Sequence, residues 1–176
     1  MIEKSASRYR GRVWIFGDEI NTDLIFPHAA FRVSPEEQIK FIFSDNRPGW
    51  VELVSPGDII VAGKNFGTGS SRPGALLLKR LGLGGMVAES YNGLFFRNCI
   101  SYGFAALQCE GVIQMFSEGD YAVVDLLEGR VLNETTGEKR FGAPLSQAVV
   151  DIVSAGGIEG LLIQEGYMDK MEDNND

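Results

Sequence analysis

Cysteine and histidine are scarce in this sequence of 176 residues, which contains two cysteines and one histidine. Cys99 and Cys109 lie in hydrophobic stretches without Cys-x-x-Cys spacing, so we expect buried free thiols and no metal site on this chain. A serine nucleophile usually relies on a histidine as its base, and nothing around His28 indicates such a role. A self-contained Ser-His-acid triad is therefore disfavoured.

Basic residues are also few. The chain has 16 lysines and arginines against 24 aspartates and glutamates, a formal net charge of -8. Proteins that bind nucleic acid cluster Lys and Arg, so we expect no nucleic-acid partner. Apolar runs such as ALLL (75–78) are too short to cross a bilayer, and no basic segment followed by an apolar one opens the chain. We expect a cytoplasmic protein without a membrane partner.

The composition is that of an ordinary globular protein, with 44% hydrophobic residues, and the length suits one domain. We expect residues 1–167 to form this domain and the acidic residues 168–176 to form a disordered tail. Short apolar runs predict strands at 12–17, 58–63, 85–89 and 104–109, and two or three antiparallel strands between 120 and 142.

Helices are predicted at 34–45, 73–82, 90–103 and 144–157. The first of them opens with a capping box, because Ser34 is followed by Pro35 and, three residues on, by Glu37. Strands that alternate with helices predict an α/β fold, in which helices flank a mostly parallel sheet and the later strands add an antiparallel hairpin portion.

The stretch KNFGTGSSRP (64–73) places glycines, serines and an arginine between a predicted strand and a predicted helix. Backbone N–H groups at a helix start favour a negative ligand. The stretch is neither a P-loop nor a complete dinucleotide fingerprint. Ser70, Ser71 and Arg72 suit a small carboxylate, because a planar guanidinium offers two parallel donors. The alternative is that the glycines only make a tight turn and Arg72 pairs with a surface acid.

Three blocks of sequence resemble, in order and spacing, the small subunits of 3-isopropylmalate dehydratases. They are GDEINTDLIFP (17–27), VAGKNFGTGSSR (61–72) and AESYNGLFFRNCISYG (88–103). These subunits correspond to the swivelling β/β/α domain of the aconitase superfamily. The resemblance implies a hydro-lyase that moves a hydroxyl between neighbouring carbons of a substituted malate through an alkene, as in leucine biosynthesis.

In this family a [4Fe-4S] cluster acts as a Lewis acid on the substrate, while a serine alkoxide takes the proton. Three cysteine thiolates are needed for such a cluster, and this chain has two cysteines in all. The resemblance therefore implies that a separate large subunit carries the cluster, and that the two chains share a site for a dicarboxylic or tricarboxylic hydroxy acid. Self-association of the isolated small subunit stays open.

Carried over by position, Ser70 is the proton-abstracting base, and Arg72 with the backbone of Ser71 holds a substrate carboxylate. Asp23 matches an acidic residue at the edge of the family's active site. A local turn made by NTD (21–23) is the alternative for Asp23.

The segment HAAFRV (28–33) resembles the part of the family that reads the substituent of the malate, with Arg32 as a substrate contact. Arg32 favours a substituent that bears a carboxylate, whereas Phe31 and Val33 favour an alkyl group. A solvated Arg32 between buried apolar neighbours is the alternative, so the segment leaves the substrate open.

Two residues depart from the family's usual G-C-G-S-S-R-E loop. Thr68 replaces the cysteine, which is nearly isosteric, and Pro73 replaces the glutamate, which removes a carboxylate beside Arg72. A proline is well tolerated in the first turn of a helix. Three hypotheses follow: a subunit acting on isopropylmalate, one acting on homoaconitate, citramalate or 2,3-dimethylmalate, and a non-catalytic module that binds a carboxylate or a partner surface.

Overall fold

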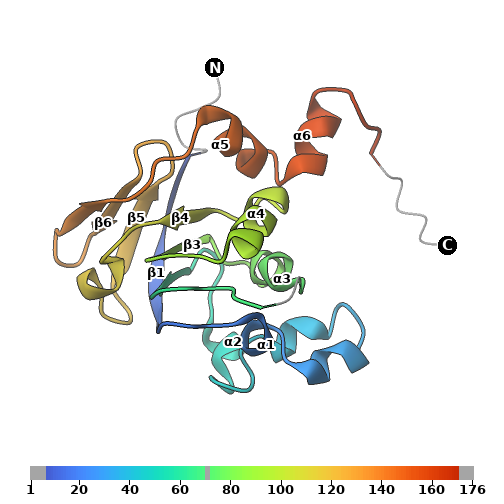
Figure 1. Cartoon of the computed structure of the whole chain (residues 1–176), viewed down its shortest axis with the longest axis horizontal. Helices are drawn as coiled ribbons and strands as arrows, with labels where there is room; N and C mark the ends of the chain where they lie inside the picture. The colour runs from blue at the N-terminus through green and yellow to red at the C-terminus, as the bar shows by residue number, and fades with distance from the viewer. Residues whose placement is uncertain (1–6, 70–71, 171–176) are drawn as a thin grey trace.

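Strand β1 (Arg8–Phe16) is the centre of the sheet in the computed structural model, which describes residues 7–69 and 72–170. Its C-terminal half pairs in parallel with β2, whereas its N-terminal half pairs antiparallel with β5. The order of the seven strands is β4-β3-β2-β1-β5-β6-β7, with the parallel strands on one side of β1 and the hairpins on the other (Figure 1). The predicted α/β fold with a parallel and an antiparallel portion is confirmed.

The other strands are β2 (Ile59–Ala62), β3 (Gly85–Ala88), β4 (Ala106–Gln108), β5 (Tyr121–Asp125), β6 (Arg130–Asn133) and β7 (Lys139–Phe141). The α-helices are α1 (Thr22–Ile25), α2 (Trp50–Leu53), α3 (Gly74–Arg80), α4 (Gly93–Ser101), α5 (Gln147–Ser154) and α6 (Ile158–Gln164). Short 3-10 helices are η1 (His28–Arg32), η2 (Gln38–Phe41) and η3 (Val112–Met115). None of the helices in the described part of the chain has the length and hydropathy needed to cross a membrane.

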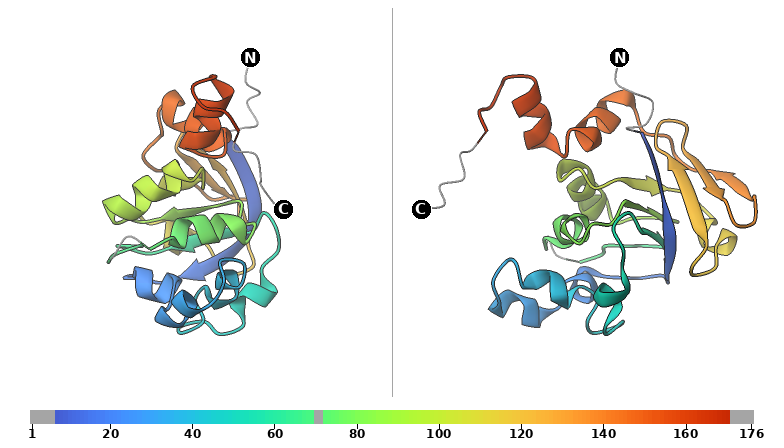
Figure 2. Two further views of the ribbon diagram at one scale, coloured as in Figure 1. Left: turned by 90° about the vertical axis from the view of Figure 1, so that its right-hand side faces the viewer. Right: turned by 180° about the vertical axis from the view of Figure 1, so that it is seen from behind.

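Each parallel strand contributes to two cores, one on each face of the sheet. In β2, Ile60 and Ala62 belong to the core beneath α3 and α4, whereas Ile59 and Val61 belong to the core on the opposite face. A strand covered on both faces is apolar throughout. The run at 58–63, which is mostly apolar, therefore predicts β2 well. Figure 2 shows α3 and α4 between α5 and α6 at one end and α1 and α2 at the other.

The helix predicted at 34–45 is wrong, because the described chain forms turns and the 3-10 helix η2 there. One of the two capping-box contacts does form, since the Ser34 backbone N–H donates to Glu37 Oε2 at 3.3 Å. Phe43, however, is fully buried, takes a φ of 56° and packs its ring 4.3 Å from that of Phe16. Packing in the core thus overrides the local helix signal.

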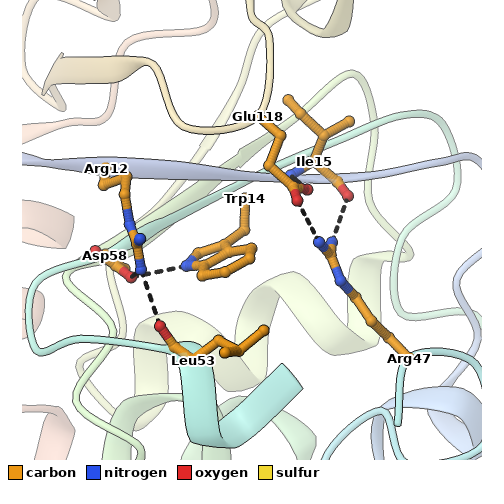
Figure 3. Close-up of polar contacts among 7 residues, drawn as sticks. All are labelled: Arg12, Trp14, Ile15, Arg47, Leu53, Asp58 and Glu118. Atoms are coloured by element: carbon orange, nitrogen blue, oxygen red, sulfur yellow. Dashed lines mark hydrogen bonds and ion pairs between the residues drawn. The ribbon is translucent and has the colours of Figure 1, made fainter. Parts of the chain in front are cut away.

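Asp58, just before β2, joins β1 to the loop that follows α2. Its Oδ2 accepts hydrogen bonds from Arg12 Nη2 at 2.9 Å, from Trp14 Nε1 at 2.7 Å and from the Ser55 N–H at 3.0 Å. Figure 3 shows Arg12 and Trp14 directed at this carboxylate, with Arg47 on the far side of the indole. Asp58 is buried, and its Oδ2 is the shared acceptor for these three donors.

Replacing Asp58 by alanine is expected to lower the free energy of unfolding by about 3 kcal/mol, because the indole N–H and the Arg12 guanidinium lose their buried acceptor. Urea unfolding of the chain measures this change. Asp45 is exposed, so Asp45→Ala serves as a matched control and should change stability by less than about 0.5 kcal/mol. Equal midpoints for the two variants would contradict a structural role for Asp58.

Candidate functional site

The segments that follow β1, β2 and β3 lie side by side beyond the carboxyl ends of these parallel strands. The Thr22 N–H donates to the Thr68 carbonyl at 2.8 Å, and the Phe66 N–H donates to the Ser90 carbonyl at 3.0 Å. Ligands of open parallel sheets bind at this edge. The three sequence blocks at 17–27, 61–72 and 88–103 therefore meet at one place.

Glycine and asparagine give the loop after β2 its shape. Gly67 has a φ of +80°, and a Cβ built on it would lie 2.1 Å from the Phe95 ring, so no other residue fits. Asn65 is left-handed with a φ of 57°, and its side-chain amide donates to Glu19 Oε1 at 2.5 Å. This contact binds the loop after β2 to the loop after β1.

Arg72 and Asp23, both predicted as site residues, form an ion pair of 2.6 Å between Nη2 and Oδ1. Arg72 Nη1 also donates to the Phe26 carbonyl at 2.6 Å, and the guanidinium carbon lies 5.2 Å from the centre of the Phe31 ring. The Arg72 side chain is 15% exposed, whereas that of Asp23 is 68% exposed. The guanidinium is thus fixed before a ligand arrives, and Asp23 supplies the neighbouring carboxylate that Pro73 does not.

The ion pair borders an open hollow of about 480 Å³, a volume in the range of small-molecule sites. Its lining among the described residues consists of Asn21, Thr22, Asp23, Thr68, Gly69 and Arg72. Ser70 and Ser71, the predicted base and the predicted carboxylate ligand, lie outside the described residues. Their roles stay predictions that rest on the sequence.

Arg32 ends η1 with its side chain exposed and is not among the described residues that line the hollow. Its neighbour Phe31 is closer to the site, because its ring faces Arg72 and packs edge-on against Phe26 with 4.8 Å between centroids. Phe31 is 53% exposed. A contact between Arg32 and substrate stays a prediction. The exposed ring of Phe31 lies at the edge of the site.

Two elements of the site are not identified as such by the sequence. The Phe26 acceptor is a backbone carbonyl, whose position depends on the fold and not on the side chain. Thr22 lines the hollow beside Asn21 and Asp23, whereas the sequence indicates for this threonine only the local turn of NTD (21–23).

Both cysteines are buried free thiols, as predicted. Burial raises the pKa of the Cys109 thiol to about 11, with Glu89 adding to the rise, and burial also raises the pKa of Cys99. Thiols of this kind are poor metal ligands because the thiolate is the binding form. Among the described residues no three His, Cys, Asp or Glu side chains are grouped to hold a metal ion. The residues that the structure describes therefore do not fit an iron–sulfur cluster.

Comparisons with known proteins agree with this arrangement. The family described as Aconitase C-terminal domain matches residues 34–111. The chain is 43% identical over 152 residues to the isopropylmalate/citramalate isomerase small subunit of Methanocaldococcus jannaschii, covering 85% of this chain and 90% of that protein. It is 42% identical over 159 residues to 3-isopropylmalate dehydratase small subunit 1 of Methanopyrus kandleri, covering 89% and 94%.

A solved structure gives the same result for the fold. The crystal structure of 3-isopropylmalate dehydratase from Methanocaldococcus jannaschii matches with a TM-score of 0.83 at 27% sequence identity, covering 91% of this chain and 96% of that one. The fold and the sequence identity indicate the same family, and so does the position of the three sequence blocks at one edge of the sheet. The chain belongs to the small subunits of the 3-isopropylmalate dehydratases, which are hydro-lyases of the aconitase family.

Proposed function

We propose that this chain is the small subunit of a heteromeric hydro-lyase that converts 2-isopropylmalate to 3-isopropylmalate by dehydration and rehydration. The observation that supports it best is the preorganised Arg72 beside the hollow at the carboxyl ends of β1 and β2. Arg72 binds a carboxylate of the acid, and the backbone of Ser71 adds a donor. Ser70 takes the proton from the carbon that neighbours the departing hydroxyl.

A large subunit completes this site. The described residues of this chain do not fit an iron–sulfur cluster, so we assign the cluster, with its Lewis-acid chemistry, to the large subunit. The hollow is open on this chain, and a second subunit that covers it would exclude water from the site.

Citramalate is the second candidate substrate, because the relative from Methanocaldococcus jannaschii is named for both isopropylmalate and citramalate. The exposed Phe31 ring favours a substrate with an alkyl substituent over one with a third carboxylate. The test is to purify the chain with its large subunit, to reconstitute the cluster without oxygen, and to follow the alkene intermediate by absorbance with a panel of substituted malates. Turnover of another acid without turnover of isopropylmalate would refute the proposed substrate.

Phe31→Ala is expected to lower kcat/KM for isopropylmalate about tenfold, with a smaller effect on citramalate, because the larger alkyl group loses more apolar contact. The measurement is the ratio of the two kcat/KM values in the assembled enzyme. Phe141 on β7 is 67% exposed, and Phe141→Ala should leave the ratio unchanged. An equal loss for both acids in Phe31→Ala would show that Phe31 does not read the substituent.

A further inference from the structure

Glu89, the residue after β3, carries a buried carboxylate without a partner. The residue is 7% exposed, and its Oε1 is enclosed without a hydrogen bond to any of the described residues. No ion pair joins its side chain to a described residue either. Burial of a charge is costly unless the charge is paired, and an unpaired buried group in a native fold calls for a specific explanation.

The backbone of Glu89 places this residue at the same edge of the sheet as the hollow. Its N–H donates to the carbonyls of Ala62 at 3.1 Å and Gly63 at 3.2 Å, where β2 ends. Ser90 follows Glu89, and its hydroxyl accepts from the Asn65 N–H at 2.9 Å, in the loop that leads from β2 to the hollow. A subunit that covers the hollow therefore approaches the chain at the edge where Glu89 lies.

Arg140 is a basic residue near Glu89, but its contacts are with other groups. Burial raises the pKa of the Cys109 thiol to about 11, with smaller contributions from Arg140, which lowers it, and from Glu89, which raises it. Both charged groups thus lie near this thiol. The Arg140 guanidinium donates to the Glu110 carbonyl at 3.4 Å and lies 3.7 Å from Glu138 Oε1. The charge of Glu89 is therefore not balanced by an ion pair within the described part of the chain.

We propose that Glu89 is a docking residue for the large subunit, and that its carboxylate accepts charge-assisted hydrogen bonds from a lysine or arginine of that subunit. This inference rests on the proposed function, in which a large subunit covers this edge of the sheet. A second copy of this chain is a poor partner for Glu89, because its formal net charge of -8 brings more negative charge to the edge. The small subunit thus carries an unpaired charge until the large subunit binds, and the pair that then forms is shielded from water.

Glu89→Gln keeps the shape of the side chain and removes its charge, and it is expected to have opposite effects on the isolated chain and on the complex. The isolated variant should unfold at a higher urea concentration than the unchanged chain, because an unpaired buried charge is gone. Its affinity for the large subunit should fall about 30-fold, because a cation of that subunit is left without its counter-charge. Calorimetric titration of the large subunit with each small subunit measures the affinity.

Glu110→Gln is the matched control. Glu110 is exposed two residues after the end of β4, and it contacts Arg140 through its backbone carbonyl, which the substitution keeps. Glu110→Gln should therefore leave both the urea midpoint and the affinity for the large subunit unchanged.

Each other result counts against the proposal. An unchanged or lower urea midpoint in Glu89→Gln would mean that the carboxylate has a partner within its own chain. A higher midpoint with unchanged affinity would mean that the large subunit does not use the charge. A loss of self-association of the small subunit in Glu89→Gln, seen by sedimentation, would assign the contact to a second copy. If the unchanged chain itself does not bind the large subunit, the proposed function fails along with the role of Glu89, whereas in the other cases the proposed function stands.

Discussion

Ser70→Ala is expected to reduce turnover by about 10²–10⁴-fold, which is the usual contribution of a general base. The hydroxyl is the group that takes the proton on our proposal, and alanine removes it without adding bulk. Turnover is measured in the complex with the large subunit and the reconstituted cluster. Co-purification of the two chains checks that the variant still assembles.

The neighbouring serine provides a matched control for this substitution. Ser71 acts through its backbone N–H on our proposal, and Ser71→Ala keeps that group, so its turnover should stay within a few-fold of the unchanged enzyme. If instead Ser71→Ala is the inactive variant and Ser70→Ala is active, the assignment of the two serines is reversed.

Arg72→Lys is expected to raise KM about 10–100-fold, the range expected when a charge-assisted hydrogen bond to a carboxylate is lost. A lysine retains the charge, but its compact ammonium does not reproduce the planar fork. In the structure that fork is held by Asp23, by the Phe26 carbonyl and by the face of Phe31. Initial rates against substrate concentration give KM and kcat separately.

Arg80→Lys is the control for the arginine variant. Arg80 is exposed at the end of α3, the helix that begins shortly after Arg72, so its replacement should leave KM unchanged. A large fall in kcat at unchanged KM in Arg72→Lys would assign Arg72 to the chemical step and would contradict its role as a ground-state clamp.

Strands were predicted from the sequence more reliably than helices, for a physical reason. A strand buried on both faces, such as β2, is apolar in every residue, and a short run rich in β-branched residues is typical of such a strand. The segment 34–45 has a good helix start, but the burial of Phe43 decides its conformation, and local signals do not contain that contact. Helix α6 was also missed, since it begins directly after the glycines that seemed to end α5.

For Asp23 and Arg72, the local turn and the ion pair that the sequence allows as alternatives are both present, and their roles at the site stay predictions. NTD does make a local turn, because Asn21 Oδ1 accepts from the Leu24 N–H at 2.9 Å. Asp23 nevertheless reaches Arg72 from that turn. Arg72 does pair with an exposed acid, and the pair still borders the hollow. A sequence can identify such residues by resemblance, but the contact of Arg72 with the Phe26 carbonyl follows only from the three-dimensional structure.

The position of β1 has a consequence for synthesis of the chain. Arg8 in this strand bonds to Asp125 in β5, which lies 117 residues later in the sequence. Contacts of such long range are slow to form, because the intervening loop must close first. On the ribosome, β1 emerges early with both edges unpaired and keeps one edge open until β5 has followed. An unpaired strand edge can pair with other chains, so the strand that later becomes the centre of the sheet is open to misassembly until β5 is synthesised.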